Sequence, residues 1–160
     1  YGLSQTVNRT TERTAPYLSG LQALDVLMSP DGNRALVSYK TGRTISLYLR
    51  SEDGTYTDTG LDTYAEKCIW SGDSVIAYCA EPIGQISAAA PDDWYQGLVT
   101  YSDDVWRINT TDVTTKVLFS PFDEGQYSLD IIDLGISADE RYLYFRDKED
   151  QYFWTYQLEA

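Results

Sequence analysis

The chain contains no histidine, the residue that proteins use most often as a general base and as a metal ligand. Nucleophilic systems that pair serine or cysteine with histidine therefore cannot be assembled within its 160 residues. Its two cysteines are too few for a structural zinc site, which needs several cysteine or histidine ligands. We expect no catalytic residues, no metal site and no cofactor.

Basic residues are also scarce. Lysine and arginine number 12 against 25 acidic residues, which gives a net charge of −13 at pH 7. Proteins that bind nucleic acids normally carry a basic patch, and anionic membrane surfaces attract polybasic segments. The charge therefore argues against a nucleic-acid partner and is typical of a soluble, self-repelling protein.

Long apolar runs are missing as well. No stretch approaches the roughly 18 residues that a membrane-spanning helix needs, so we expect no direct membrane insertion in this segment. The chain has no signal peptide and no initiator methionine, and its first residues, Tyr1-Gly2-Leu3-Ser4, resemble the middle of a strand. We expect an excised fragment or a processed product.

What the sequence does contain is a turn that occurs three times between apolar, β-rich runs. The three copies are Ser29-Pro30-Asp31-Gly32-Asn33, Ser71-Gly72-Asp73-Ser74 and Ser137-Ala138-Asp139-Glu140. Repetition of one motif between strands indicates a repeat architecture. The first two copies are 42 residues apart, which is the length of one blade of a β-propeller.

The first complete repeat has the strand order of a propeller blade. Four runs, 22–29, 34–40, 43–50 and 55–59, are separated by turns and grade from apolar to polar. In a blade the first strand lines the crowded centre and the fourth faces solvent. The same pattern predicts strands at 67–71, 74–80, 98–109 and 114–120, and then at 129–137, 142–147 and 151–158.

These runs predict an all-β fold, a single β-propeller fragment whose blades have four antiparallel strands. The blades cover residues 1–20 (a partial blade made of two outer strands), 21–61, 62–121 and 122–160 (three strands). About three and a half blades form only a partial or open ring, since closed rings need four to eight. The free edge should pair with the missing remainder of the propeller or with a protein partner. At most one short helical turn is expected, at 88–90.

The second and third turns are 66 residues apart, which leaves an excess over one blade. We assign most of this excess to an insertion at 82–97, on the face that also carries the loops joining successive blades. Within it, Asp92, Asp93, Trp94 and Tyr95 offer two acceptors beside two aromatic rings, a mixture that holds peptides and carbohydrates. The alternative is that Trp94 and Tyr95 fold back to cover the edge of the blade.

Cys68 and Cys79 flank the second turn. In a hairpin that turns at Asp73-Ser74 they face each other directly, at a separation that a disulfide can bridge. A disulfide would indicate an oxidising compartment. The alternative is a pair of reduced, buried thiols.

Acidic residues cluster at 52–53, 103–104, 123–124 and 147–150. None of these clusters has the alternating aspartate pattern of a calcium loop, and most lie at predicted turns. We interpret them as solvated turn charges. No spacing singles out a carboxylate pair for glycoside hydrolysis.

The Ser-Pro-Asp-Gly turn and the apolar strand after it, residues 29–39, resemble the repeat of TolB-like and WD-type propellers. The Gly-His and Trp-Asp signatures of WD repeats are absent, which favours the TolB-like variety. The segments 68–79 and 91–97 are also similar to uncharacterised extracytoplasmic propeller proteins of bacteria. This resemblance implies a secreted, periplasmic or cell-surface location.

TolB-like repeats occur in envelope scaffold proteins and as lids on serine peptidases. The resemblance therefore implies a non-catalytic module that serves as a protein-binding or scaffold surface. The alternatives are an accessory or lid domain of a hydrolase such as a serine peptidase, and a carbohydrate-binding module with a glycan partner.

Overall fold

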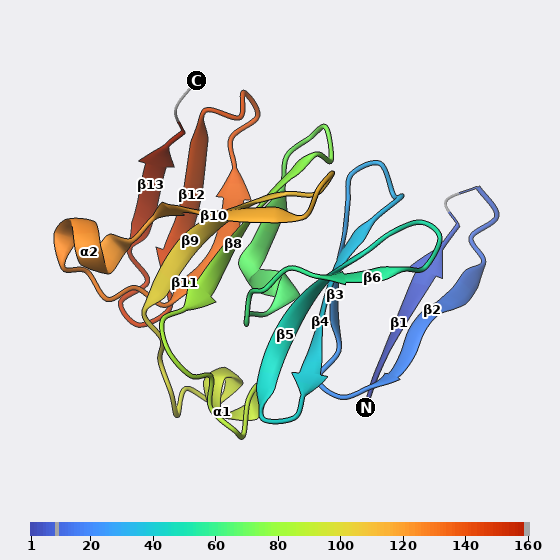
Figure 1. Ribbon diagram of the computed structural model, residues 1–160, viewed down its shortest axis with the longest axis horizontal. Coiled ribbons are helices and arrows are strands. Elements are labelled where there is room, and N and C mark those ends of the chain that lie inside the picture. Colours follow the sequence, from blue (N-terminus) through green and yellow to red (C-terminus); the bar gives the residue numbers. More distant parts are fainter. Residues whose placement is uncertain (9, 159–160) are drawn as a thin grey trace.

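The computed structural model describes residues 1–8 and 10–158, which form a row of antiparallel sheets that does not close into a ring (Figure 1). The first sheet pairs β1 with β2 (Gly2–Val7 and Thr14–Leu21). The all-β, open-propeller prediction is confirmed. Among the described helices, none is long and apolar enough to cross a membrane.

Blade 1 is a four-stranded sheet in the order β3-β4-β5-β6. Its strands are β3 (Asp25–Met28), β4 (Ala35–Thr41), β5 (Thr44–Arg50) and β6 (Tyr56–Asp58). In β5 the side chains of Ile45, Leu47 and Leu49 are buried and alternate with half-buried neighbours, because successive residues of a strand point to opposite faces. The short polar β6 is exposed throughout.

Blade 2 has the sheet order β10-β9-β8-β7. Its elements are η1 (Ala65–Lys67), β7 (Cys68–Trp70), β8 (Ile76–Pro82), α1 (Asp92–Tyr95), β9 (Asp103–Asn109) and β10 (Thr114–Phe119). The third strand begins at Asp103 and not at Leu98 as expected, because its pairing with β8 ends where Pro82 faces Asp103. The pairing of β9 with β10 is irregular at one place, between Val117 and Phe119.

Blade 3 contains three strands in the order β11-β12-β13. Their bounds are Ile131–Ile136, Tyr142–Asp147 and Phe153–Gln157. Before them lies α2 (Pro121–Gly125), in a segment that we expected to be a loop. The hydroxyl of Ser120 accepts a hydrogen bond from the Asp123 amide and Pro121 occupies the first helical position, which is a typical helix start.

The three repeated turns have one geometry. In each, the serine hydroxyl donates a 2.6 Å hydrogen bond to the aspartate two residues later; the pairs are Ser29 with Asp31, Ser71 with Asp73, and Ser137 with Asp139. This bond is the largest cause that lowers the pKa of each of these aspartates. The fourth residue of each turn has a left-handed backbone, with φ of 75° at Gly32, 63° at Ser74 and 54° at Glu140.

The same turns also connect neighbouring blades. The Asp31 amide donates to the Ser74 hydroxyl at 3.1 Å, and the Gly72 amide donates to the Glu140 carboxylate at 2.6 Å. In both cases the left-handed residue of one blade reaches back to the turn of the blade before it. The repeated motif therefore closes each inner hairpin and also sets the spacing between blades.

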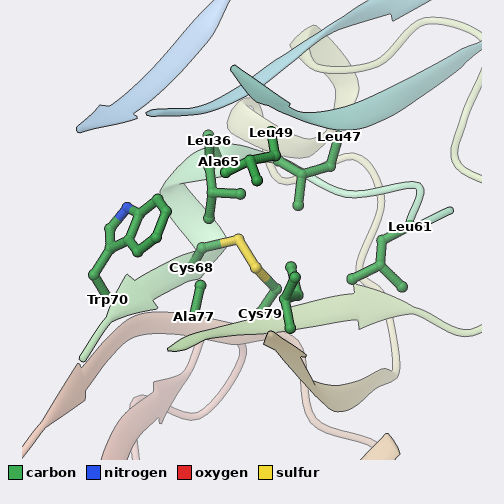
Figure 2. Packing of buried hydrophobic residues seen from close by; sticks show 10 residues of the cluster. Leu36, Leu47, Leu49, Leu61, Ala65, Cys68, Trp70, Ala77 and Cys79 are labelled. Atoms are coloured by element: carbon green, nitrogen blue, oxygen red, sulfur yellow. A yellow bond between two sulfur atoms is a disulfide. The ribbon is translucent and has the colours of Figure 1, made fainter. Parts of the chain in front are cut away.

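The first junction between blades encloses the disulfide. Leu36, Leu47 and Leu49 of blade 1 pack against Cys68 and Cys79 of blade 2 (Figure 2). The two cysteines are cross-strand partners with Cα atoms 4.1 Å apart, and they form the predicted disulfide. The apolar packing and the covalent bond thus lie in the same core.

The second junction is built from apolar and aromatic side chains of blades 2 and 3. The rings of Phe119 and Tyr156 stack with centroids 4.0 Å apart, and Phe119 also stacks on Phe145 at 6.1 Å. The end of β10 is thereby fixed against the outer strands of blade 3.

The sheet of β1 and β2 is joined to β3 by only three residues, 22–24. The Arg50 guanidinium of blade 1 lies 4.7 Å from the centre of the Tyr17 ring and donates to the Tyr17 hydroxyl at 3.0 Å. These contacts place the sheet beside blade 1. That β1 and β2 are the outer strands of a preceding blade stays a prediction, as do the blade boundaries drawn from the sequence.

Candidate functional site: the insertion loop of blade 2

The structure places one long segment between β8 and β9, residues 83–102, which we call the insertion loop. It is longer than the predicted insertion because residues 98–102 belong to the loop and not to β9. Its base is closed by a 2.7 Å hydrogen bond from the Ile83 amide to the Ser102 carbonyl. Residues 88–90 form a turn that leads through Pro91 into α1. The expectation of at most one short helical turn is wrong, because η1, α1 and α2 are all helical.

The insertion loop docks on the β4–β5 turn of blade 1. The Lys40 ammonium donates to the carbonyls of Ala88 and Ala90 at 2.7 and 3.3 Å. Beside this contact, a groove of about 470 Å³ lies between the insertion loop and the β4–β5 turn. Its lining consists of Arg43, Thr44, Asp62 and residues 84–88. Asp62 belongs to the connection between blades 1 and 2, so the loop does share a face with a loop that joins blades.

The four predicted binding residues lie in α1 but point in different directions. Asp92 is exposed, and Asp93 accepts a 2.7 Å hydrogen bond from the Ser87 hydroxyl. Tyr95 is 57% exposed and its hydroxyl donates to the carboxylate of Glu66. Trp94 is only 3% exposed and points into the protein. That these residues bind a partner stays a prediction.

The buried Trp94 ring fixes the loop to its support. The ring stacks on Tyr64 with centroids 5.0 Å apart and planes 11° apart. Its Nε1 donates a 2.7 Å hydrogen bond to Asp130, which directly precedes β11 of blade 3. The Lys148 ammonium lies 4.3 Å from the ring centre and donates to the Trp94 carbonyl. Trp94 therefore links the loop to blades 2 and 3 together.

Beneath Trp94 lies a buried cluster of Lys67, Asp103 and Asp130, which we call the charge cluster. The Lys67 ammonium is 2.6 Å from Asp103 Oδ2 and 2.9 Å from Asp130 Oδ1, and all three side chains are at most 1% exposed. Backbone amides add to this arrangement. The Ile131 amide donates a hydrogen bond to the Asp103 carboxylate at 2.6 Å, and the Tyr101 amide donates one to the Asp130 carboxylate at 3.2 Å.

Two carboxylates share a single ammonium in this cluster, so it carries excess negative charge. Burial raises the pKa of Asp103 to about 6, although the ammonium of Lys67 acts in the opposite direction. Asp103 Oδ1 has no hydrogen-bond partner among the described residues. The charge cluster is closed off from solvent, so it supports the insertion loop and is not shaped to bind a ligand directly.

Our interpretation of all the acidic clusters as solvated turn charges is wrong for Asp103 and for Asp147. Asp103 is buried at the start of β9, and Asp147 is buried while it accepts a 2.9 Å hydrogen bond from the Asp130 amide. Lys67 and Asp130 were not among the predicted site residues. Each of them directly precedes an apolar strand run, Cys68-Ile69-Trp70 or Ile131-Ile132. A charged residue in that position was the one sequence feature that could have indicated a buried ion pair. Among the described residues no group of acidic and cysteine side chains could hold a metal ion.

The raised pKa of Asp103 predicts that the stability of the folded protein depends on pH. Because the folded protein holds this proton more tightly than the unfolded chain, where the pKa is near 3.8, the contribution of Asp103 to stability is lost as pH rises from about 4 to about 6. We expect Asp103→Asn to remove this loss. Urea denaturation of both proteins across that range should show the stability of the parent chain falling relative to the variant.

Other shifted carboxyl groups do not obscure this comparison. Asp31, Asp73 and Asp139 have lowered pKa values, so they act below about pH 4. Burial raises the pKa values of Glu66 and Glu81, so these two groups act in the same direction as Asp103, but they are present in both proteins and the comparison with the variant removes their contribution. Stability curves that run parallel from pH 4 to pH 6 would contradict the assignment to Asp103.

No protein-family model matches the sequence, and no curated protein matches it either. Solved structures do resemble the fold. TolB from Acinetobacter baumannii superimposes with a TM-score of 0.66 at 11% identity, over 99% of this chain and 35% of that one. The tricorn protease superimposes with a TM-score of 0.55 at 12% identity, over 92% of this chain and 14% of that one.

These similarities show the fold and, at such low identity, the fold alone. The chain has a TolB-like β-propeller fold, as the repeated turn predicted. It spans about a third of the length of that TolB chain and a smaller share of the protease. The class of protein at hand is therefore a propeller module.

Proposed function

We propose that this chain is a non-catalytic propeller module that binds a protein partner through its insertion loop. The observation that carries this proposal is the exposure of three large apolar side chains on that one loop. Ile83 is 51% exposed, Tyr95 57% and Leu98 70%. Apolar and aromatic anchors of this kind dominate the energetics of protein interfaces.

The support beneath these residues favours binding over simple covering of the blade edge. The stacked Trp94 and the charge cluster fix the loop before any partner arrives. A preformed surface loses less conformational entropy on association, so more of the contact energy appears as affinity. The adjacent groove, with Arg43 and Asp62 in its wall, adds polar groups beside the apolar anchors.

We further propose that the parent protein is an extracytoplasmic bacterial protein. The disulfide between Cys68 and Cys79 supports this, since such bonds persist in oxidising compartments and are rare in the cytosol. The net charge of −13 is compatible with such a location.

The two other functions expected from the sequence have unequal support. A carbohydrate site would need exposed rings for stacking, but Trp94 is buried and only Tyr95 of the predicted pair is accessible. A role as an accessory domain of a hydrolase is favoured by one observation, the match of this chain to 14% of the tricorn protease chain. A hydrolase domain encoded in the same full-length gene would support that second candidate.

The binding proposal is tested with the double variant Tyr95→Ala/Leu98→Ala. The matched control is Leu3→Ala/Val7→Ala, which removes two exposed apolar side chains from β1, outside the loop. Each protein is immobilised and incubated with the extracytoplasmic fraction of the source organism, and the retained proteins are quantified by mass spectrometry.

We expect a defined set of proteins to be retained by the parent chain and by the control, and to be depleted at least tenfold with the loop variant, since tenfold corresponds to the loss of only about 1.4 kcal/mol of binding energy. Unchanged melting temperatures would show that all three proteins are folded. Equal retention by the loop variant would overturn the proposal.

A further inference from the structure

We propose that the groove beside the insertion loop binds an extended peptide segment that carries one acidic and one basic side chain. This inference rests on the proposed function, because it names the chemistry of the partner that the loop meets. The groove is the one of about 470 Å³ between the insertion loop and the β4–β5 turn. It lies between blades 1 and 2, each of which has four strands.

Hydrogen bonds at both ends of the groove fix its walls. At one end, the Lys40 ammonium donates to the carbonyls of Ala88 and Ala90, which places the β4–β5 turn beside the insertion loop (Figure 1). At the other end, the Asp62 amide donates to the Glu81 carboxylate at 2.7 Å, just before the loop begins. The walls are therefore in place before a ligand arrives, and binding loses less conformational entropy.

Arg43 gives the groove a positive charge. It lies in the β4–β5 turn, is exposed, and forms no ion pair with an acidic side chain of the described residues. Thr44, the first residue of β5, adds a hydroxyl to the same wall. A guanidinium binds a carboxylate through two parallel hydrogen bonds. This end of the groove therefore fits an acidic side chain.

Asp62 gives the opposite end a negative charge. Its carboxylate accepts a 3.0 Å hydrogen bond from the Ser46 hydroxyl, and within the described part of the chain neither Asp62 nor Glu81 forms an ion pair. Glu81 also faces Asp104 across the pairing of β8 with β9, and like charges in that arrangement are destabilising. Burial raises the pKa of Glu81, and the charges of Asp62 and Asp104 act in the same direction. This end therefore fits an ammonium or a guanidinium group.

The two charges line one groove without pairing with each other, so both are available to a ligand of opposite polarity. Complementary charges of this kind fix the register and the direction of a bound segment. The charge pattern thus selects a segment with its acidic residue at Arg43 and its basic residue at Asp62.

The third wall favours a peptide over a small zwitterion. Gly84, Gln85 and Ile86 line the groove, and their backbone groups form no hydrogen bond to the described residues. Such groups can pair with the main chain of a bound peptide, whereas a free amino acid is too short to use them all. The exposed Ile83 directly precedes this wall, so one partner segment can cover the groove and reach the apolar anchors.

The probe is a peptide of five residues, because five residues of the loop, 84–88, line the groove. Its order is glutamate, serine, alanine, serine, lysine, and both ends are capped so that only side chains are charged. One control peptide has the two charged residues exchanged, one has two glutamates, and one has two lysines. Each is titrated into the isotope-labelled 160-residue chain, and binding is followed by the NMR shifts of the amides of residues 84–88.

We expect saturable binding of the mixed-charge peptides, with one order bound about three- to tenfold more tightly than the other, as expected for one or two surface charge pairs. Both like-charged peptides should bind more weakly than the preferred order. The two-lysine peptide is the critical control, since the net charge of −13 attracts any cation.

The variant Arg43→Asp/Asp62→Arg exchanges the charges of the groove and leaves the net charge unchanged. It should prefer the mixed-charge peptide that the parent chain binds more weakly. The matched control Glu52→Arg/Lys116→Asp makes the same kind of exchange at two exposed residues outside the groove, and it should keep the preference of the parent chain. Melting temperatures show whether the variants are folded.

Arg43→Gln provides an independent test if the exchanged variant does not fold. It should weaken the preferred mixed-charge peptide about threefold and should not weaken the two-lysine peptide. Equal affinity for the two mixed orders, binding of the two-lysine peptide as tight as that of the preferred order, or an unchanged preference in a folded Arg43→Asp/Asp62→Arg would overturn the inference.

Failure of this inference can be told apart from failure of the proposed function. Tyr95→Ala/Leu98→Ala leaves the groove residues in place, so it should bind the peptides as the parent chain does. If that variant loses protein capture while the parent chain shows no preference among the peptides, the proposed function stands and the groove inference fails. If the peptides bind as expected and the variant still captures proteins, the groove stands and the role of the anchors fails.

Discussion

Lys67→Met is expected to lower the free energy of unfolding by about 3–5 kcal/mol at pH 7, the usual cost of removing one partner from a buried ion pair. The reason is that Asp103 and Asp130 would then remain buried with no cation, although methionine fills nearly the same volume. The pKa of Asp103, which burial already raises, would rise further without the ammonium that lowers it. Urea denaturation at equilibrium measures the loss.

The pH dependence separates a charge effect from a packing effect. In Lys67→Met the carboxylates can be neutralised by protonation, so the destabilisation should shrink as pH falls from 7 to about 5. The triple variant Lys67→Met/Asp103→Asn/Asp130→Asn removes all three charges and should recover part of the lost stability at pH 7. A loss that is the same at pH 5 and pH 7, and that the triple variant does not reduce, would show that packing dominates.

The fold could be predicted from the sequence because its signals are local. The repeated serine and aspartate turns, the apolar runs between them and the facing cysteines each lie within about a dozen consecutive residues. The turns and the Cys68–Cys79 disulfide have the predicted form in the structure, and the strands follow the apolar runs except that β9 begins at Asp103. The N-terminal signal of α2 was equally local, with Ser120 as cap and Pro121 after it, and it was missed because acidic residues in the segment favoured a turn.

The support of the candidate site could not be predicted in the same way, because its parts are far apart in the sequence. Lys67 precedes β7, Asp103 begins β9 and Asp130 precedes β11. The folding of blade 2 brings the Lys67 ammonium within 3 Å of the Asp103 carboxylate, and the packing of blade 3 on blade 2 brings it within 3 Å of that of Asp130. An acidic residue at a strand end has the same sequence context whether it is solvated or paired. The local sequence therefore favoured the interpretation of Asp103 as a surface charge, because its partner Lys67 lies 36 residues earlier in the chain.

The burial of Trp94 changes what the predicted quartet can contribute to binding. An exposed tryptophan beside Tyr95 would have been an anchor residue, whereas the structure makes it the link between the insertion loop and the charge cluster. The side chains that we propose as anchors are instead the exposed Ile83, Tyr95 and Leu98, on the loop that the buried ring holds in place. Affinity should thus depend on Trp94 through the order of the loop, and on its neighbours through direct contact.

Trp94→Ala is expected to cost about 3–5 kcal/mol, the usual effect of deleting a large buried aromatic side chain. The substitution removes the stack on Tyr64, opens a cavity above the charge cluster and takes away the Nε1 donor to Asp130. Because the loop is closed at its base by Ile83 and Ser102, part of this loss should appear as local opening of residues 83–102. Urea denaturation reports the global part, and hydrogen exchange of the loop amides reports the local part.

Two control variants divide the contributions of the ring. Trp94→Phe keeps a ring on Tyr64 but loses the hydrogen bond to Asp130, which still accepts from the Tyr101 amide, together with part of the buried ring volume, so it should cost about 1–3 kcal/mol. Tyr95→Ala removes an exposed ring from the same helix and should change stability by less than about 1 kcal/mol. If Trp94→Ala is as stable as Tyr95→Ala and leaves exchange of the loop unchanged, then Trp94 does not hold the loop, and the charge cluster must position it through Tyr101 and Asp103 alone.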